Sequence, residues 1–468
     1  MRGLTTLSTL GLAIALAAIC LSSPAATVPD GAIAAIDKIA GDGIDQKKVA
    51  SYSVAVVKDG RFVLARGYGF ADLENDVPAT AETVYRLGSI TKQFTAMAIM
   101  QLVEQGKLSL DDELIKFLPD YPTGGRKITV RHLLNHTSGI SDYTRSRDFF
   151  QHSRHDFNHD ELLALFKNEP FDFEPGVRWG YSNSGYYLLG MIIEKASGQK
   201  YDQFLEERIF KPLGMSATRY GHTQPLISHR ALGYRYFFGQ LTNSDPISMD
   251  PPFAAGGLVS TVLDLIKWHQ ALEDGALVSS ASFEAMYRPA ALANGHTRPY
   301  GYGWRLGELA GHRTISHGGG INGFSTMISR YPDDRLAVIV LSNTEGANPG
   351  AVADRIAKVM LSIEDNPSVN KPKADTPVVD EPVDAALAEL LTGKYKLGNA
   401  EVEMSSIDGQ LFARFKHRPR DRLKYQGGRD FVHANDAELR ITFTPKEGKA
   451  AGLEVKGGNF KMKGERIE

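Results

Sequence analysis

The chain has 468 residues, 42% of them hydrophobic and 23% charged, which is an ordinary globular composition and enough length for two domains. Its formal net charge is only -2, so neither nucleic acid nor an anionic membrane is expected as a partner. The only cysteine is Cys20. Removal of the segment around it would exclude a cysteine nucleophile, a Cys-ligated zinc ion and an iron–sulfur cluster in the mature chain.

Residues 1–26 are predicted to be a signal peptide. Arg2 supplies a positive charge, residues 10–21 are apolar and uncharged, and a small-residue zone follows up to Ala26, as in secretory signals. The apolar run is shorter than the ~20 residues that cross a bilayer. We therefore expect export to the periplasm or the extracellular space, with no stable membrane anchor after cleavage. Lipidation of Cys20 is the alternative, which the bulky residue before it disfavours.

Residues 27–363 are predicted to form one domain of the α/β (α+β) class. Apolar and β-branched runs at 53–57, 61–65 and 336–340 predict strands. The apolar positions between Phe94 and Val103 fit one face of a helix that ends near Gly106. Because the first and last strands are both apolar, we expect them to share one sheet with helices packed on it.

The remaining residues change character. Residues 364–384 are rich in Pro, Asp, Lys and Val without periodicity and are predicted to be a linker. Residues 385–468 are predicted to be a small all-β domain, an antiparallel barrel or meander. Asp408-Gly409 is its clearest hairpin turn, and short strands are expected at 393–395, 401–404, 411–415, 439–444 and 453–455.

Ser89 and Lys92 are the first candidate catalytic pair. Residues three apart lie on one face of a helix, and a lysine whose pKa is lowered in a desolvated pocket can activate a serine. The same spacing occurs at 197–200, in a turn after a helix, and at 368–371, in the predicted linker. Ser89 alone begins a long apolar helix, whose N-terminal N–H groups favour an oxyanion.

Tyr181 and Asn183 form the second motif, just before the apolar helix predicted at 186–195. A phenol near an ammonium group can have a lowered pKa and act as general base and acid, and an amide can hold both the lysine and a substrate carbonyl. A simple helix-capping turn is the alternative interpretation.

A glycine-rich run, His317 to Gly320, forms the third motif at the end of a strand-like segment. Positions without side chains allow an extended substrate to pair with the strand through its backbone. A glycine-rich hairpin is the alternative.

Together the three motifs resemble those of the serine β-lactamase and penicillin-binding protein superfamily. The most similar branch is the class C β-lactamase-related S12 family of serine peptidases and esterases. Further similar segments are 133–140, 175–177, 211–215, 255–260 and 300–304. The resemblance implies a β-lactamase-like fold, in which helices and a helical subdomain flank an antiparallel sheet.

The resemblance also implies roles for matching residues. Ser89 would attack a carbonyl while Lys92 and Tyr181 move its proton, and the backbone N–H groups of Ser89 and Gly320 would form an oxyanion hole. No metal or cofactor is required. The residues implied in substrate binding are Asn183, His317, Gly318 and Gly320.

The implied function is hydrolysis of an amide or ester through a Ser89 acyl-enzyme. A peptidase of D-amino-acid or peptidoglycan-type peptides, similar to a D-Ala-D-Ala carboxypeptidase, is preferred, so the partners would be a small peptide or ester and a peptidoglycan-type polymer. The alternatives are a carboxylesterase of the same type, a β-lactamase, and a penicillin-binding or regulatory protein without turnover. A zinc hydrolase using His152, His155 and His159 is the rival outside the family, but no His-Glu-x-x-His pattern supports it.

One position departs from the β-lactamase pattern. The third motif of β-lactamases begins with lysine, whereas this chain has His317, and histidine is mostly neutral at pH 7. Efficient β-lactamase activity is therefore disfavoured. A substrate carboxylate would need another cation, and Arg298, Arg305 and Arg313 are equal candidates at this point.

Overall fold

The computed structural model describes residues 28–237, 239–363, 380, 382–398, 400–415, 420–434, 436–446, 449–457 and 460–468. The predicted signal peptide and most of the predicted linker lie outside the described residues. Within the described ranges, none of the helices has both the length and the apolar character needed to span a bilayer.

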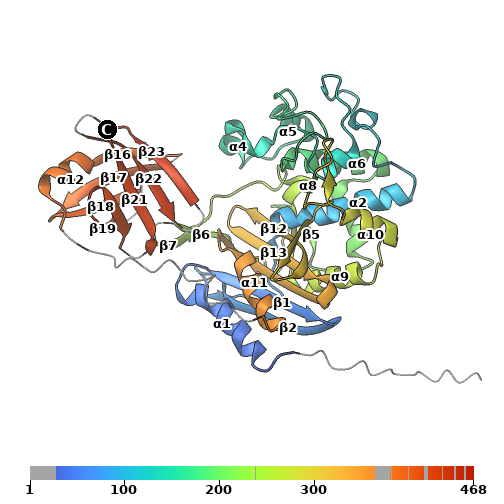
Figure 1. Ribbon diagram of the computed structural model, residues 1–468, viewed down its shortest axis with the longest axis horizontal. Helices are drawn as coiled ribbons and strands as arrows, with labels where there is room; N and C mark the ends of the chain where they lie inside the picture. Colours follow the sequence, from blue (N-terminus) through green and yellow to red (C-terminus); the bar gives the residue numbers. More distant parts are fainter. Residues whose placement is uncertain are drawn as a thin grey trace, which may run out of the picture.

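A seven-stranded antiparallel sheet lies at the centre of the larger part of the molecule (Figure 1). In spatial order its strands are β11 (Arg305–Leu309), β12 (His312–Ile321), β13 (Phe324–Tyr331), β14 (Leu336–Ser342), β1 (Ser51–Lys58), β2 (Arg61–Asp72) and β3 (Val77–Pro78). Strand β1 pairs with β14 from residue 52 to residue 58. The prediction that the first and last strands share one sheet is therefore confirmed.

Helices cover both faces of this sheet. On one face lie α1 (Ala32–Asp45) and α11 (Pro349–Met360), and on the other lie α2 (Thr91–Glu104), α6 (Asn183–Ser197) and α9 (Val262–Glu273). Val54 and Val340 face the first layer, whereas their neighbours Ala55 and Ile339 face the second. Successive side chains of a strand point to opposite faces, so each of these strands contributes to two cores, which explains why its sequence is continuously apolar.

The β-lactamase-like fold is thus present as predicted.

The end of helix α2 is also as expected from the sequence. Helix α2 ends at Glu104, and Gly106 then adopts a φ of 68°, the left-handed conformation common after helices. The shorter elements are β4 (Tyr85–Arg86), η1 (Gly88–Ile90), η2 (Leu114–Lys116), α3 (Val130–Leu134), η3 (Tyr143–Arg145), α4 (Arg147–His152), α5 (His159–Ala164), α7 (Tyr201–Leu205), η4 (Glu206–Phe210), β5 (Arg219–Tyr220), β6 (Tyr234–Phe237), β7 (Gln240–Asn243), α8 (Phe253–Gly256), β8 (Leu258–Ser260), α10 (Ser280–Met286), β9 (Ala290–Ala291), β10 (Thr297–Arg298), η5 (Pro332–Asp334) and β15 (Thr344–Glu345).

The C-terminal residues form a closed barrel of eight antiparallel strands, which confirms the predicted all-β domain. Asp408 and Gly409 have positive φ angles of 50° and 71°, as a tight hairpin turn requires. Helix α12 (Ala385–Leu391) adds Ala388 and Leu391 to the barrel core. The strands are β16 (Gly393–Leu397), β17 (Ala400–Ile407), β18 (Gln410–Phe415), β19 (Arg420–Tyr425), β20 (Asp430–His433), β21 (Asp436–Lys446), β22 (Lys449–Gly457) and β23 (Phe460–Arg466).

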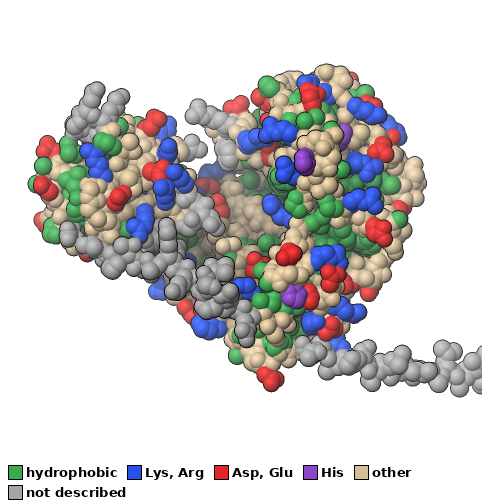
Figure 2. All heavy atoms as spheres, viewed as in Figure 1, with side chains coloured by type: hydrophobic (Ala, Val, Ile, Leu, Met, Phe, Trp, Pro, Cys, Tyr) green, Lys and Arg blue, Asp and Glu red, His purple; other side chains and the backbone are tan. Residues whose placement is uncertain are grey.

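The hairpin of β6 and β7 joins the barrel to the rest of the molecule. The rings of Phe237 and Phe415 lie 5.1 Å apart. A Cβ atom at Gly239 would lie 2.3 Å from the ring of His433, so only glycine fits at this contact. In the view of Figure 2 the surface is hollowed between the barrel and the larger part of the molecule.

Candidate active site

Ser89 and Lys92 lie where η1 continues into α2, so that one helical turn places both on the same side. Lys92 is fully buried. Its Nζ donates hydrogen bonds to Ser89 Oγ at 3.1 Å, to Asn183 Oδ1 at 2.8 Å and to the carbonyl of Ala255 at 2.7 Å. The structure thus brings together residues of the first two motifs, and it adds a backbone acceptor from α8.

Burial changes the chemistry of Lys92. Desolvation lowers its pKa to about 7, and the negative charge of Asp142 acts in the opposite direction. A large part of the Lys92 population is therefore a neutral amine near pH 7, and a neutral amine 3.1 Å from a hydroxyl can accept its proton.

Tyr181 contacts the same group. Lys92 Nζ lies 4.9 Å from the centre of the Tyr181 ring. Burial raises the pKa of Tyr181, and its hydrogen bond with Ser89 lowers it by less. The lowered pKa expected from the sequence is therefore wrong, because desolvation of the phenolate outweighs the neighbouring groups. Tyr181 stays a neutral phenol that can pass a proton.

Asn183 is held by neighbours that the motif did not reveal. Its Nδ2 donates to Asp142 Oδ2 at 3.1 Å and to Thr144 Oγ1 at 3.3 Å, and its backbone N–H also donates to Asp142. These bonds turn Oδ1 toward Lys92. Asp142 is only 7% exposed, so it supplies a buried negative charge behind the lysine.

The third motif approaches the serine through close backbone contacts. A Cβ at Gly319 would lie 1.9 Å from the carbonyl oxygen of Leu87, and a Cβ at Gly88 would lie 2.9 Å from the nitrogen of Gly320. Thr326 Oγ1 also donates to the Leu87 carbonyl at 2.7 Å. Strand β12 and η1 are therefore packed backbone to backbone beside Ser89.

This packing predicts different effects for two adjacent glycines. Gly319→Ala should destabilise the fold by about 1–3 kcal/mol, because the added methyl group forces two backbones apart. Gly320→Ala is the matched control, since nothing lies within 4 Å of its Cβ position. Urea unfolding of both variants measures the difference, and equal midpoints would contradict the close packing.

His317 is buried and neutral. Its Nδ1 lies 2.7 Å from the carbonyl of Gly318, so Nδ1 carries the proton, and Nε2 accepts the hydroxyl of Tyr300 at 2.9 Å. The pKa of His317 is lowered to about 3, mainly by burial and to a smaller extent by the charge of the nearby Lys92. The motif therefore offers no positive charge to a substrate, as the sequence indicated.

Arg305 is the candidate arginine whose charge acts at this site. Arg313 is paired with Asp333 at 2.7 Å. Burial is the main cause of the pKa shifts of Tyr181 and His317, and the charge of Arg305 acts on both as well. Strand β11 begins at Arg305 and pairs with β12 only up to residue 316. Among the described strands, residues 317–321 of β12 pair with β13 alone, so their other edge has no strand partner.

The predicted zinc-hydrolase alternative has no support in the geometry. His159 contacts the Tyr187 hydroxyl at 2.7 Å and Glu194 at 3.1 Å. Within the described part of the chain, no three His, Cys, Asp or Glu side chains are grouped as metal ligands.

Comparison with known proteins agrees with this geometry. Residues 36–360 match the protein family described as Beta-lactamase. The chain belongs to the β-lactamase family. It is 36% identical over 318 residues to penicillin-binding protein 4* of Bacillus subtilis, an alignment that covers 64% of this chain and 70% of that protein.

Two solved structures extend the comparison of this β-lactamase family member. The D-amino acid amidase of Ochrobactrum anthropi SV3 has 27% identity and a TM-score of 0.64, covering 70% of this chain and 99% of the amidase. The octameric penicillin-binding protein homologue of Pyrococcus abyssi has 26% identity and a TM-score of 0.62, covering 92% of this chain and 99% of the homologue. The family's amidases and penicillin-binding proteins are serine hydrolases.

Proposed function

We propose that this chain is an exported serine peptidase that cleaves D-amino-acid or peptidoglycan-type peptides through an acyl-enzyme on Ser89. The observation that carries the proposal is the buried Lys92, whose Nζ lies 3.1 Å from Ser89 Oγ and whose pKa is lowered to about 7 by burial. A base of that pKa is suited to activating a hydroxyl near neutral pH.

Acylation then proceeds in two steps. Ser89 Oγ attacks the substrate carbonyl carbon as its proton moves to the neutral amine of Lys92, and the N–H groups of Ser89 and Gly320 stabilise the oxyanion. The proton passes through the phenol of Tyr181 to the leaving nitrogen as the C–N bond breaks. Water attacks the resulting ester by the reverse route, so that Ser89 regains its proton and the acid product leaves.

The edge of β12 that has no strand partner favours an extended peptide as substrate. A peptide that pairs with residues 317–321 would reach Arg305 at the point where β11 begins. Since His317 is neutral, Arg305 supplies the positive charge for a terminal carboxylate. The names of the relatives, a D-amino acid amidase and penicillin-binding proteins, fit the same substrate class.

Arg305→Gln tests this role. We expect the KM for a D-Ala-D-Ala peptide to rise on the order of tenfold, because a charge-assisted hydrogen bond to the carboxylate is lost. Hydrolysis of a neutral p-nitrophenyl ester should be unchanged. Arg298→Gln is the control for general surface charge, and an equal rise in KM in that variant would contradict the assignment.

A carboxylesterase is the second candidate, favoured by the neutral His317, which makes no demand for a substrate carboxylate. Steady-state rates on a D-Ala-D-Ala peptide, its L-Ala-L-Ala counterpart, a p-nitrophenyl ester and a penicillin distinguish the functions. Preference for the D-peptide supports the proposal. Turnover of the ester alone would replace the peptidase proposal with a carboxylesterase, and a burst without turnover would indicate a penicillin-binding protein.

Mass analysis of the secreted chain tests whether residues 1–26 are removed on export.

A further inference from the structure

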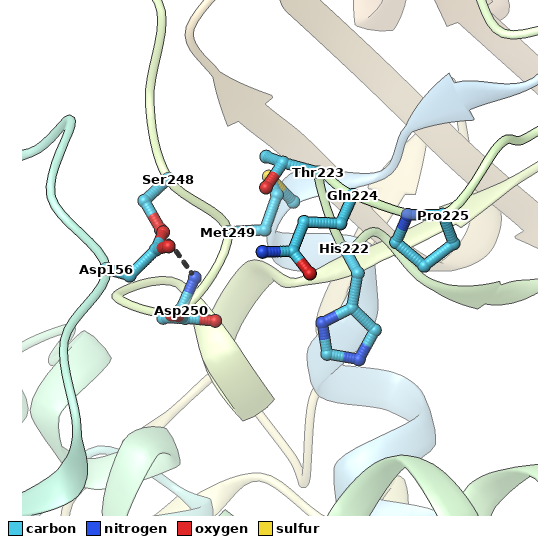
Figure 3. A pocket seen from close by; sticks show the side chains of 8 residues that line it. All are labelled: Asp156, His222, Thr223, Gln224, Pro225, Ser248, Met249 and Asp250. Carbon is cyan, nitrogen blue, oxygen red and sulfur yellow. Dashed lines mark hydrogen bonds between the residues drawn. The ribbon is translucent and has the colours of Figure 1, made fainter.

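A buried histidine packs against the phenol that passes the proton. His136 is 1% exposed, and the centre of its ring lies 4.3 Å from that of Tyr181. It follows α3 by two residues, and the reaction proposed above does not use it. The pocket shown in Figure 3 is a different place, lined by Asp156 and by the segments 222–225 and 248–250, and none of the catalytic residues lines it.

His136 holds the backbone on both sides of Tyr181. Its carbonyl accepts a hydrogen bond from the backbone N–H of Gly180 at 3.0 Å. Its ring Nδ1 accepts one from the backbone N–H of Ser182 at 3.2 Å. One residue therefore fixes both the residue before and the residue after Tyr181, while its ring lies against the phenol itself.

The bond from Ser182 determines the proton position on the ring. A backbone N–H can only donate, so Nδ1 must be unprotonated and Nε2 carries the hydrogen. Burial lowers the pKa of His136 well below its ordinary value, and the charge of Lys92 acts in the same direction. The Nε2 atom makes no hydrogen bond with any described residue. The hydrogen bonding of the ring is thus directed to the Tyr181 segment alone.

The backbone of His136 is strained to reach this position. Its φ angle is 61°, in the left-handed region that residues other than glycine seldom adopt. Its ring is enclosed by those of Tyr186 and Tyr300, at 5.1 Å and 4.7 Å between centres. This packing keeps both the carbonyl and Nδ1 of His136 on the Tyr181 segment.

We propose that His136 is a positioning residue, which holds the phenol of Tyr181 in place as a neutral acceptor for the backbone beside it. The inference rests on the proposed function, in which Tyr181 passes a proton between Ser89 and the leaving group. Because Tyr181 stays a neutral phenol, the place of its hydroxyl decides how well it transfers the proton. A shift of about 1 Å in such a group can cost about 100-fold in rate.

Two variants of equal shape test the role of the acceptor. Asparagine and leucine branch at the same carbon, but only asparagine places an oxygen where Nδ1 of His136 lies. We expect His136→Leu to reduce kcat for a p-nitrophenyl ester by about 10- to 100-fold with little change in KM, because Tyr181 moves a proton and does not bind the substrate. His136→Asn should be at least about fivefold more active than His136→Leu. Equal rates in the two variants, or full activity in His136→Leu, would overturn the inference.

A double-mutant cycle separates positioning from a general defect in the fold. Tyr181→Phe removes the phenol hydroxyl, so that His136→Leu should then lower kcat by less than about twofold, because no proton carrier remains to be positioned. An equal loss in both backgrounds would mean that His136 acts only on the fold, and the inference would fail while the reaction at Ser89 stands. Full activity in Tyr181→Phe would remove Tyr181 from the reaction and the role of His136 with it. Fluorophosphonate labelling of Ser89 reads out the nucleophile separately.

A measurement on the natural chain does not depend on whether the variants fold. Nitrogen-15 NMR of the His136 ring, identified by its proximity to Tyr181, should show an unprotonated Nδ1 and a protonated Nε2 at neutral pH. Thermal unfolding checks the fold of each variant. A protonated Nδ1 would overturn the inference, because that atom could not accept the N–H of Ser182.

Discussion

Ser89→Ala is expected to abolish acylation and to reduce kcat on the order of 10⁴-fold or more, because the proposed reaction has no covalent route without the hydroxyl. Ser89 Oγ is the atom on which both proton carriers act. Lys92 Nζ lies 3.1 Å from it, and Tyr181 shares a hydrogen bond with it. Removing this one oxygen leaves both proton carriers in place, so the loss measures the nucleophile alone.

Intact-mass analysis after incubation with a fluorophosphonate, a penicillin and a D-Ala-D-Ala peptide measures this effect. Ser197→Ala is the matched control, because Ser197 belongs to the second Ser-x-x-Lys match but lies at the end of α6 with its hydroxyl near Gln199. The Ser197 variant should be labelled like the natural chain. Labelling that persists in Ser89→Ala would remove Ser89 from the mechanism.

Those parts of the fold with a strong local pattern were predictable. The apolar runs of β1 and β14 are long enough to indicate two buried strands, and the Asp408-Gly409 turn indicates a hairpin. Strands β20 and β23 were not predicted. β20 has only four residues, Asp430–His433, too few to show a clear pattern, whereas β23, Phe460–Arg466, begins with apolar residues alternating with lysines, a strand pattern that was overlooked. Their pairing depends on closure of the barrel, which is a tertiary property.

The residues of the site likewise divide into those that a sequence motif reveals and those that only folding brings together. Side chains with a fixed spacing, Ser89 and Lys92, were found by their motif. The Ala255 carbonyl was not, because a backbone acceptor leaves no residue-type signal. Asp142 lies two residues after the similar segment 133–140, so a role near the site could have been suspected. Its contact with Asn183, however, is made only in the folded chain. The direction of the Tyr181 pKa shift was missed since a motif does not report burial.

Lys92→Met is expected to reduce kcat/KM by about 10²- to 10⁴-fold, because a buried general base is replaced by an apolar chain of similar length. In the natural chain, the unprotonated amine is the active form. With a pKa of about 7, about a tenth of Lys92 is unprotonated at pH 6 and about nine tenths at pH 8. The pH profile of ester hydrolysis should therefore rise through neutrality to a plateau, and Lys92→Met should lose this rise.

The rise can be assigned to Lys92 through Asp142. The negative charge of Asp142 raises the pKa of Lys92, against the larger effect of burial. Asp142→Asn removes the charge while an amide oxygen remains to accept a hydrogen bond from Asn183 or Thr144. The rise should then move to lower pH, because the protonated lysine loses its stabilising neighbour. A rise that stays in place would mean that another group controls the profile. A shift to higher pH would contradict Lys92 as the base, since loss of a nearby negative charge cannot favour an ammonium ion.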